Sequence, residues 1–203
     1  MFGAAQLLNL AGYTGGSEGN GVFLRTDRLM LTPYTANIVT QTHIDWLNDK
    51  ENLKYSEQRH LDHTLKSQRE YLNKFPKDSF IWLIQVKVDN RLEDIGSISA
   101  YVDPYNGTAD MGILIAKEHK GKGYGEESWK RVMDFLVEGN IRKITCGCRS
   151  DNAAMICLAS FYMTREGRRW AHFLDDNDCP VDLIYFAYHN GSWKASIPGG
   201  QYD

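Results

Sequence analysis

The sequence predicts an α/β protein of the mixed (α+β) kind, in which a central sheet of about seven strands is flanked by about four helices. Three observations lead to this prediction. Apolar, β-branched runs of strand length alternate with longer segments whose apolar residues recur every three or four positions. A strand, a basic glycine-rich loop and a long helix follow one another directly over residues 108–138. The 203 residues show no internal repeat and no second domain boundary, which favours one core.

The first third of the chain is expected to supply one strand and two helices. Residues 22–31 alternate between apolar and polar side chains, as a half-buried strand does. Residues 38–47 carry their apolar side chains at helical spacing. Residues 64–75 form the second predicted helix, because Thr64 is a suitable N-cap and Pro76 stops the helix at its other end.

The middle of the chain is expected to form antiparallel strands. Residues 80–88 and 95–102 are strand-like, and the polar pair Asn90-Arg91 between them predicts a hairpin. A further turn leads to the strand at 108–115, which becomes more apolar and β-branched toward its end.

The last third is expected to alternate between helix and strand. Residues 126–138 have apolar side chains three and four positions apart, and Gly139-Asn140 supplies a left-handed stop for that helix. The same patterns predict the remaining elements, which are strands at 141–148, 169–174 and 182–189 and a helix at 152–164.

The domain organisation follows from this series of elements. Residues 1–21 contain six glycines, short polar residues and one small apolar cluster at Leu7, Leu8 and Leu10, which predicts a flexible N-terminal lead. Residues 22–194 are interpreted as a single domain, and residues 195–203 as a C-terminal tail.

Composition excludes several classes of function. The net charge of −3 gives no general attraction to nucleic acid or to anionic membranes. No apolar run reaches the length of a membrane span, and no secretory signal is recognisable, so a cytoplasmic protein is expected. The four cysteines lack paired zinc-ligand spacing and are interpreted as reduced thiols, so no metal is expected: Cys146, Cys148, Cys157 and Cys179.

The loop Lys120-Gly-Lys-Gly-Tyr-Gly125 is the segment most indicative of function. A glycine-rich turn that enters a helix directs several backbone N–H groups into one concavity, which suits a phosphate. Lys120 and Lys122 add positive charge. The alternative is a tight strand-to-helix turn whose glycines only permit close packing.

This segment resembles a known family. The stretch from Gly112 to Gly125 is similar to the central signature of the GNAT superfamily of N-acetyltransferases, with Gly123 and Gly125 matching and Lys120 standing where Arg or Gln is usual. The stretch Leu24-Arg-Thr-Asp-Arg-Leu-Met-Leu31 and a later Trp-Leu-Asn-Asp segment resemble the RimJ/RimL branch in particular. The resemblance implies a mixed, mostly antiparallel sheet, a cytoplasmic acyltransferase, and acetyl-CoA as cofactor.

The resemblance also implies which residues bind the cofactor. The pyrophosphate is expected on the loop that comprises Lys120, Gly121, Lys122, Gly123, Tyr124 and Gly125. The pantetheine arm is expected on the backbone of Ile113, Leu114 and Ile115, which otherwise read as buried strand residues. Asn152 matches the family asparagine that bonds this arm, although an ordinary N-cap explains it equally well.

Candidate catalytic residues are fewer than candidate cofactor-binding residues, because this chain differs from the family at two catalytic positions. Asp110 precedes Gly112 on the central strand and is a candidate general base, with a solvated strand aspartate as the alternative. Ala159 stands where the family tyrosine protonates the departing thiolate, so Ser160 and Tyr162 are the nearest candidate hydroxyls. Gly147 replaces the glutamate that some relatives use as base.

The acceptor wall of this fold corresponds to the segment between the first two helices. Tyr55, Arg59 and His60 in that segment suit an acceptor with a phosphate or carboxylate, while a solvated loop is the alternative. We therefore expect transfer of an acetyl group to a primary amine of a small molecule, with an amino sugar or nucleotide-linked amino sugar preferred. A protein N-terminus, a nucleobase, and a non-catalytic coenzyme A-binding module are the alternatives, and a homodimer is left open.

Overall fold

The computed structural model describes residues 21–191 of the chain. The predicted lead at 1–21 and tail at 195–203 lie outside the described residues, apart from Gly21. The predicted extent of the single domain, 22–194, therefore stays a prediction.

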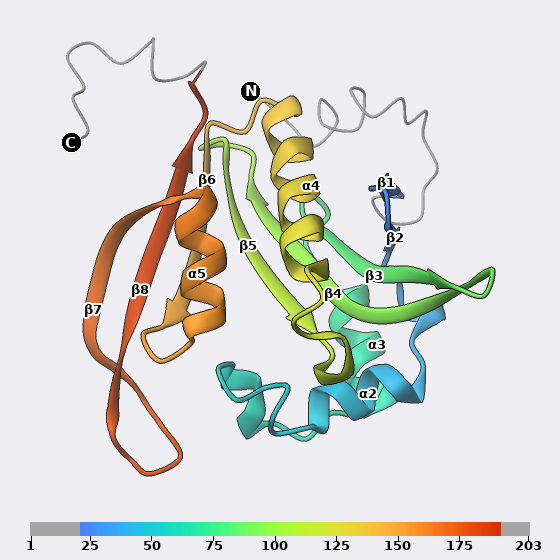
Figure 1. Ribbon diagram of the computed structural model, residues 1–203, viewed down its shortest axis with the longest axis horizontal. Coiled ribbons are helices and arrows are strands. Elements are labelled where there is room, and N and C mark those ends of the chain that lie inside the picture. The colour runs from blue at the N-terminus through green and yellow to red at the C-terminus, as the bar shows by residue number, and fades with distance from the viewer. Residues whose placement is uncertain (1–20, 192–203) are drawn as a thin grey trace.

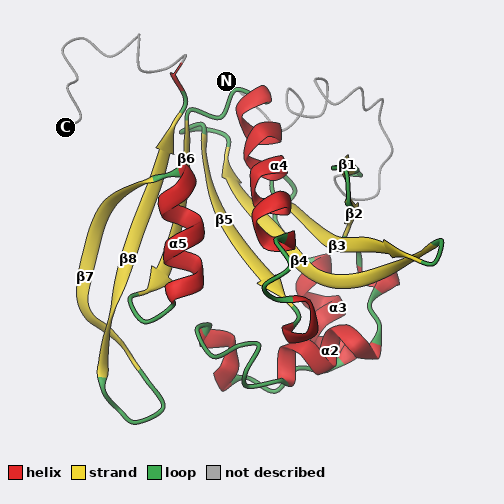
Figure 2. Ribbon diagram, viewed as in Figure 1, coloured by secondary structure: helices red, strands yellow, loops and turns green. Residues whose placement is uncertain are grey.

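Eight strands form one sheet (Figures 1 and 2). They are β1 (Leu24–Arg25), β2 (Leu29–Pro33), β3 (Phe80–Val88), β4 (Arg91–Asp103), β5 (Thr108–Ile115), β6 (Lys143–Arg149), β7 (Thr164–Leu174) and β8 (Pro180–His189). Four α-helices accompany them, namely α2 (Gln41–Asn48), α3 (Leu65–Asn73), α4 (Tyr124–Glu138) and α5 (Ala153–Tyr162). Three short 3₁₀ segments complete the described elements: η1 (Ala36–Ile38), η2 (Glu57–His60) and η3 (Lys117–His119).

The strand order is β1-β2-β3-β4-β5-β6-β8-β7. Every neighbouring pair is antiparallel except β5 and β6, which are parallel. The prediction of a mixed, mostly antiparallel sheet flanked by helices is thus confirmed.

The one extra strand arises from the first predicted strand, which is divided in two. The Thr26 backbone N–H donates to the Leu29 carbonyl oxygen at 3.0 Å, and the Thr26 side-chain oxygen accepts from the Leu29 N–H at 2.9 Å. These bonds close a tight turn, so residues 24–25 fold back onto β2. Residues 25–28 are four consecutive polar residues, so the apolar pattern on either side of them belongs to two separate strands.

Other helix and strand boundaries differ by a few residues from the predicted ones. Helix α4 begins at Tyr124, inside the predicted loop, and its stop is the left-handed Asn140 at φ 67°, whereas Gly139 has φ −76°. Helix α5 ends at Tyr162, because Met163 is already extended and β7 follows directly. The β3–β4 turn lies one position earlier than predicted, at Asp89-Asn90, both with positive φ.

Apolar packing covers both faces of the sheet. On one face, α4 contributes Trp129, Val132 and Leu136 to the larger core, with Phe135 edge-on to Phe80 and Trp82. On the other face, a smaller cluster joins residues of α2 and α3 to the sheet: Tyr34, Val39, Ile44, Leu72 and Leu83. Figure 1 shows α4 and α5 beside each other across the sheet, with α2 and α3 below. Among the described residues, no helix is both long and apolar enough to cross a membrane.

Candidate active site

The parallel strands β5 and β6 are paired only at one end. Their register runs from Thr108 opposite Lys143 to Asp110 opposite Thr145, and no further pair between them follows. Beyond this point the strands diverge, as Figure 1 shows. The backbone edge of residues 111–115 that faces β6 is therefore not occupied by strand pairing. A cleft of about 830 Å³ occupies this opening, with Gly112, Ile113, Leu114 and Ile115 in its wall.

The glycine loop borders one half of the cleft, which we call the cofactor half. Gly121 and Gly123 have positive φ values of 74° and 80°, which side-chain-bearing residues rarely adopt. A Cβ at Gly121 would meet no atom within 4 Å, so the loop there faces open space. Lys120, Gly121, Gly123, Tyr124 and Gly125 all line the cleft, whereas Lys122 is not in its wall.

The start of α4 supplies hydrogen-bond donors to the cofactor half. The first backbone bond of the helix runs from the Glu127 N–H to the Gly123 carbonyl at 3.1 Å. The N–H groups of Tyr124, Gly125 and Glu126 precede that bond and have no acceptor within the helix. Gly123 is the N-cap and provides no side-chain bond. These donors and the positive end of the helix dipole suit a pyrophosphate.

Arg28 stabilises the glycine loop, and it was not among the site residues predicted from the sequence. Its guanidinium donates to the Lys122 carbonyl at 3.1 Å and to Glu127 Oε2 at 2.6 Å, and it lies over the Tyr124 ring. Thr26 also donates to Glu127. Desolvation raises the pKa of Glu127, but the bonds from Thr26 and Arg28 outweigh it and hold the pKa below its ordinary value. The Glu127 carboxylate is thus paired with Arg28 and is not in the cleft wall. No local signal identifies Arg28, because it lies 94 residues from Lys122.

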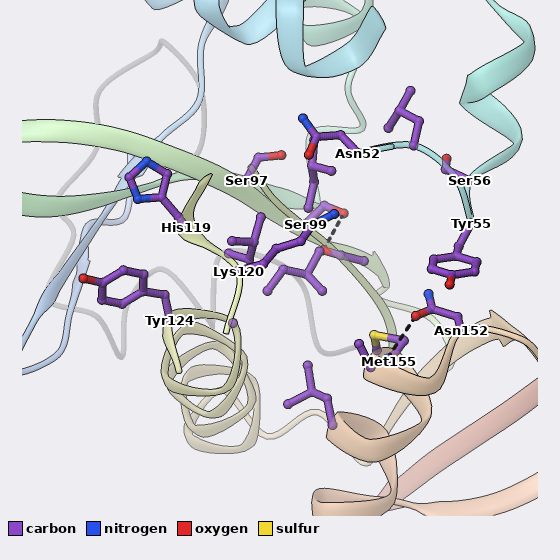
Figure 3. A pocket seen from close by; sticks show the side chains of 18 of the residues that line it. Asn52, Tyr55, Ser56, Ser97, Ser99, His119, Lys120, Tyr124, Asn152 and Met155 are labelled. Carbon is purple, nitrogen blue, oxygen red and sulfur yellow. Dashed lines mark hydrogen bonds between the residues drawn. The ribbon is translucent and has the colours of Figure 1, made fainter. Parts of the chain in front are cut away.

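Helix α5 forms the opposite wall of the cofactor half. Asn152 caps the helix, and its Oδ1 accepts from the Met155 N–H at 3.1 Å. Its amide also lines the cleft and points toward the Tyr55 hydroxyl (Figure 3). The capping role and a ligand-binding role are therefore compatible. Further along, Met155, Leu158 and Phe161 line the cleft.

The other half of the cleft, which we call the acceptor half, is lined mainly by neutral hydroxyl and amide groups. Ile113 and Ile115 pack into the larger core, so the alternate residues of β5 face away from α4. That face forms the floor, and α3, the Leu53–Gln58 segment and Tyr34 form the walls. The polar residues that line this half are Tyr34, Asn52, Tyr55, Ser56, Gln58, Gln68, Tyr71, Ser97, Ser99 and Tyr101. Figure 3 shows the floor serines and the wall residues Asn52, Tyr55 and Ser56 around one space.

Two tyrosines are joined in the acceptor half. The hydroxyls of Tyr71 and Tyr101 lie 2.5 Å apart. Burial is the main cause of a raised Tyr71 pKa, and the bond to Tyr101 raises that pKa further. The Tyr71 hydroxyl therefore stays protonated at neutral pH.

Asp110 lies on the acceptor face of β5, two residues before Gly112. It stands opposite Tyr101 of β4 and Thr145 of β6, at the last paired position before the strands diverge. The Thr145 hydroxyl donates to its carboxylate at 2.7 Å. Burial raises the pKa of Asp110 above its ordinary value, and the Thr145 bond partly offsets that rise. The side chain is beside the cleft but not in its wall.

The two candidate hydroxyls on α5 are not brought into the cleft. Ser160 is exposed and is not in its wall. The Tyr162 hydroxyl donates to Glu126 Oε1 at 3.1 Å, at the start of α4. Burial is the first cause of a raised Tyr162 pKa, and the bond to Glu126 adds to it.

Of the three predicted acceptor residues, only Tyr55 lines the cleft. The Arg59 guanidinium is directed away from it, because it donates to the Ser56 carbonyl at 3.1 Å, to Glu57 at 2.7 Å and to the Leu174 carbonyl at 2.9 Å. These bonds fasten the β7–β8 hairpin to η2. His60 is exposed, and its nearest charged partner is Glu57 at 3.7 Å. The basic anion pocket expected around Arg59 is therefore not formed.

Residues 28–160 match the acetyltransferase (GNAT) domain family. The chain belongs to the GNAT acetyltransferase family. It is accordingly an N-acetyltransferase that uses acetyl-CoA, as the sequence predicted. No curated protein sequence matches the chain.

Solved structures show the same fold. A RimL ribosomal L7/L12 α-N-protein acetyltransferase in complex with coenzyme A has a TM-score of 0.71 and 20% identity, over 82% of this chain and 97% of that one. The microcin C7 self-immunity acetyltransferase MccE in complex with acetyl-CoA and AMP has a TM-score of 0.66 and 15% identity, over 81% and 93%. A GCN5-related N-acetyltransferase from Brucella melitensis has a TM-score of 0.67 and 16% identity, over 85% and 80%. These likenesses show the fold, and the RimJ/RimL branch stays a prediction.

Within residues 21–191 there is no group of three or more His, Cys, Asp or Glu side chains arranged to hold a metal ion. The predicted cytoplasmic location and the acceptor stay predictions.

Proposed function

We propose that this protein transfers the acetyl group of acetyl-CoA to the primary amine of a small molecule that bears neutral hydroxyl groups, such as an amino sugar. The observation that supports this acceptor is the lining of the acceptor half, where ten polar side chains are hydroxyl or amide groups. The basic side chains in the cleft wall, His119 and Lys120, belong to the η3 and glycine-loop segments.

In this proposal the glycine loop and the first turn of α4 hold the pyrophosphate, and Lys120 adds charge. The open backbone of Ile113, Leu114 and Ile115 receives the pantetheine arm, with Asn152 on the facing helix. The cofactor supplies an activated acetyl thioester when bound. The chain therefore has to orient a neutral amine beside that thioester and to accept its proton.

Asp110 is the proposed proton acceptor. Its position at the divergence of β5 and β6 places it beside Tyr101, which lines the acceptor half. A raised pKa makes this carboxylate a stronger base than an ordinary aspartate. Since Asp110 is not itself in the cleft wall, we propose that it acts through water.

The structure provides less support for a nucleotide-linked amino sugar. Such an acceptor needs cations for its phosphates, and Arg59 is committed to the η2 and hairpin contacts. A protein N-terminus remains the second candidate, supported by the fold shared with RimL.

Initial rates with acetyl-CoA and an acceptor panel test the proposal. The panel contains glucosamine, galactosamine, a nucleotide-linked glucosamine, and a tetrapeptide with a free N-terminus. Faster acetylation of the free amino sugars is expected. The proposal is wrong if only the peptide is acetylated, or if acetyl-CoA is turned over with none of these amines.

A further inference from the structure

Tyr34 lies at the inner end of the acceptor half, immediately after β2. Its side chain lines the cleft, yet the residue is only 6% exposed. Its hydroxyl is buried without a partner at normal hydrogen-bond geometry. Leaving a buried hydroxyl unpaired costs about 1–3 kcal/mol, so such a group in a folded protein calls for an explanation.

The polar groups behind Tyr34 are paired with one another. His43 stands edge-on to the Tyr34 ring, with centroids 5.2 Å apart, and its Nδ1 accepts from the Thr40 N–H at 3.3 Å. His43 Nε2, which then carries the proton, donates to Asp94 at 2.8 Å. Asp94 also accepts from Gln85 at 2.7 Å. These hydrogen bonds hold the His43 ring, which packs against the Tyr34 ring, and none of them uses the Tyr34 hydroxyl.

Gln68 of α3 lies beside this hydroxyl and is 8% exposed. Burial raises the pKa of Tyr34 to about 12, and a side-chain interaction with Gln68 opposes the rise, although the two groups do not meet at normal hydrogen-bond geometry. Tyr34 is thus a neutral hydroxyl next to a neutral amide, and both groups can donate and accept. A carboxylate or phosphate would find no charge there to offset its desolvation, whereas an alcohol group could bond both residues.

We propose that Tyr34 and Gln68 form a specificity subsite that binds a hydroxyl group of the acceptor. This inference rests on the proposed function, because it places the acceptor amine in the same half of the cleft. The amine end lies toward Gly112 and the hydroxyl-bearing end toward Tyr34. The subsite thereby selects hydroxylated amines over plain alkylamines.

Two matched pairs of amines test the subsite. Serinol differs from isopropylamine by two hydroxyls, and glucosamine is paired with cyclohexylamine. Tyr34→Phe removes the single oxygen and keeps the ring on His43. Tyr105→Phe is the control, since Tyr105 is 87% exposed and lies outside the cleft.

With Tyr34→Phe we expect KM for serinol and glucosamine to rise about 5- to 10-fold, the usual effect of one neutral hydrogen bond. KM for the two plain amines, kcat, and the affinity for coenzyme A should stay unchanged. The melting temperature without ligand should be equal to or above that of the wild type, because no bond within the fold is lost. Tyr105→Phe should change none of these values.

Two results would overturn the inference. One is an equal KM change for hydroxylated and plain amines, or none for either. The other is a melting temperature several degrees lower, which would show that the hydroxyl is paired within the fold.

Binding is also measured without catalysis, as the shift in melting temperature that glucosamine or serinol causes in the presence of free coenzyme A. A shift in the wild type that is lost in Tyr34→Phe supports the subsite even if no amine is acetylated and the proposed function fails. No shift with either compound contradicts the subsite.

Discussion

The two halves of the cleft are built in different ways. The cofactor half comes mainly from one continuous stretch, residues 112–125, and offers backbone groups at a divergent strand, a glycine loop and a helix start. The acceptor half is assembled from side chains on segments far apart in the chain, from Tyr34 to Tyr101. Binding through backbone groups requires a particular local conformation. That conformation depends on neighbouring residues, so it can be recognised as a sequence motif. Side-chain recognition depends on which distant residues the fold brings together.

The largest effect on turnover is expected from Asp110→Asn, which changes the charge at the boundary of the two halves. Removal of a general base lowers kcat by about 100-fold. The wild-type rate should rise with pH as Asp110 loses its proton, at a pH above the ordinary aspartate value because burial raises its pKa. Asp110→Asn should lose this dependence. Steady-state rates between pH 4 and pH 9 measure both effects, and an unchanged profile in the variant would assign the base elsewhere.

The same Asp110→Asn substitution should stabilise the folded protein at pH 7, although it lowers kcat. A carboxyl group whose pKa is raised in the folded state binds its proton more tightly there than in the unfolded state, so stability falls as pH rises through the folded pKa. At pH 7 the folded protein carries this charge, and because the residue is exposed the expected effect is small. Asp110→Asn removes this charge. The gain in free energy of unfolding of the variant over the wild type should therefore be larger at pH 7 than at pH 4. Urea unfolding at the two pH values measures the change, and a loss of stability at pH 7 would contradict the assignment.

Arg59→Ala tests whether the predicted acceptor residue is instead structural. The Arg59 side chain is 8% exposed and bonds three groups, including the Leu174 carbonyl. Its loss should lower the free energy of unfolding by about 1–3 kcal/mol. The affinity for acetyl-CoA should be unchanged. Arg69→Ala, at an exposed position on α3, is the control. A stable variant whose only defect is KM for anionic acceptors would restore the original interpretation.

A smaller effect is expected from Lys120→Gln in the cofactor half. The lysine points into the cleft and adds charge to a site made mostly of backbone groups (Figure 3). The Kd for acetyl-CoA should rise by about 2- to 5-fold, because exposed charges contribute little. Its dependence on salt should also weaken, since the interaction is screened. Lys66→Gln on exposed α3 surface is the control. A loss of binding larger than 100-fold would mean that the side chain, and not the backbone, dominates.

The strand and loop that carry the cofactor half could be predicted from sequence because their determinants are local. The bounds of β5 were predicted to the residue, as an apolar β-branched run ending at a glycine loop. The division of the first strand was missed, although the four polar residues 25–28 interrupt the alternating pattern where the Thr26–Leu29 bonds close the turn.

Long-range contacts explain what the sequence could not show about the site. Arg59 lies next to Tyr55 in a polar segment that suggests anion binding, but its guanidinium bonds a carbonyl 115 residues away. Arg28 braces a loop 94 residues ahead of it. Tyr34 and Gln68 become a candidate subsite only because α3 packs over the end of β2.

The most direct test of the cofactor half is a calorimetric titration of the wild type, Gly123→Glu and Gly167→Glu with acetyl-CoA. Gly123 has φ 80° and lies 3.2 Å from Arg28 at its Cβ position, whereas a Cβ at Gly167 meets no atom within 4 Å. Glutamate at position 123 should strain the loop and repel the pyrophosphate, so micromolar binding by the wild type and Gly167→Glu should be lost in Gly123→Glu. Equal binding by all three proteins would show that the glycine loop is only a turn and that the cofactor is held elsewhere.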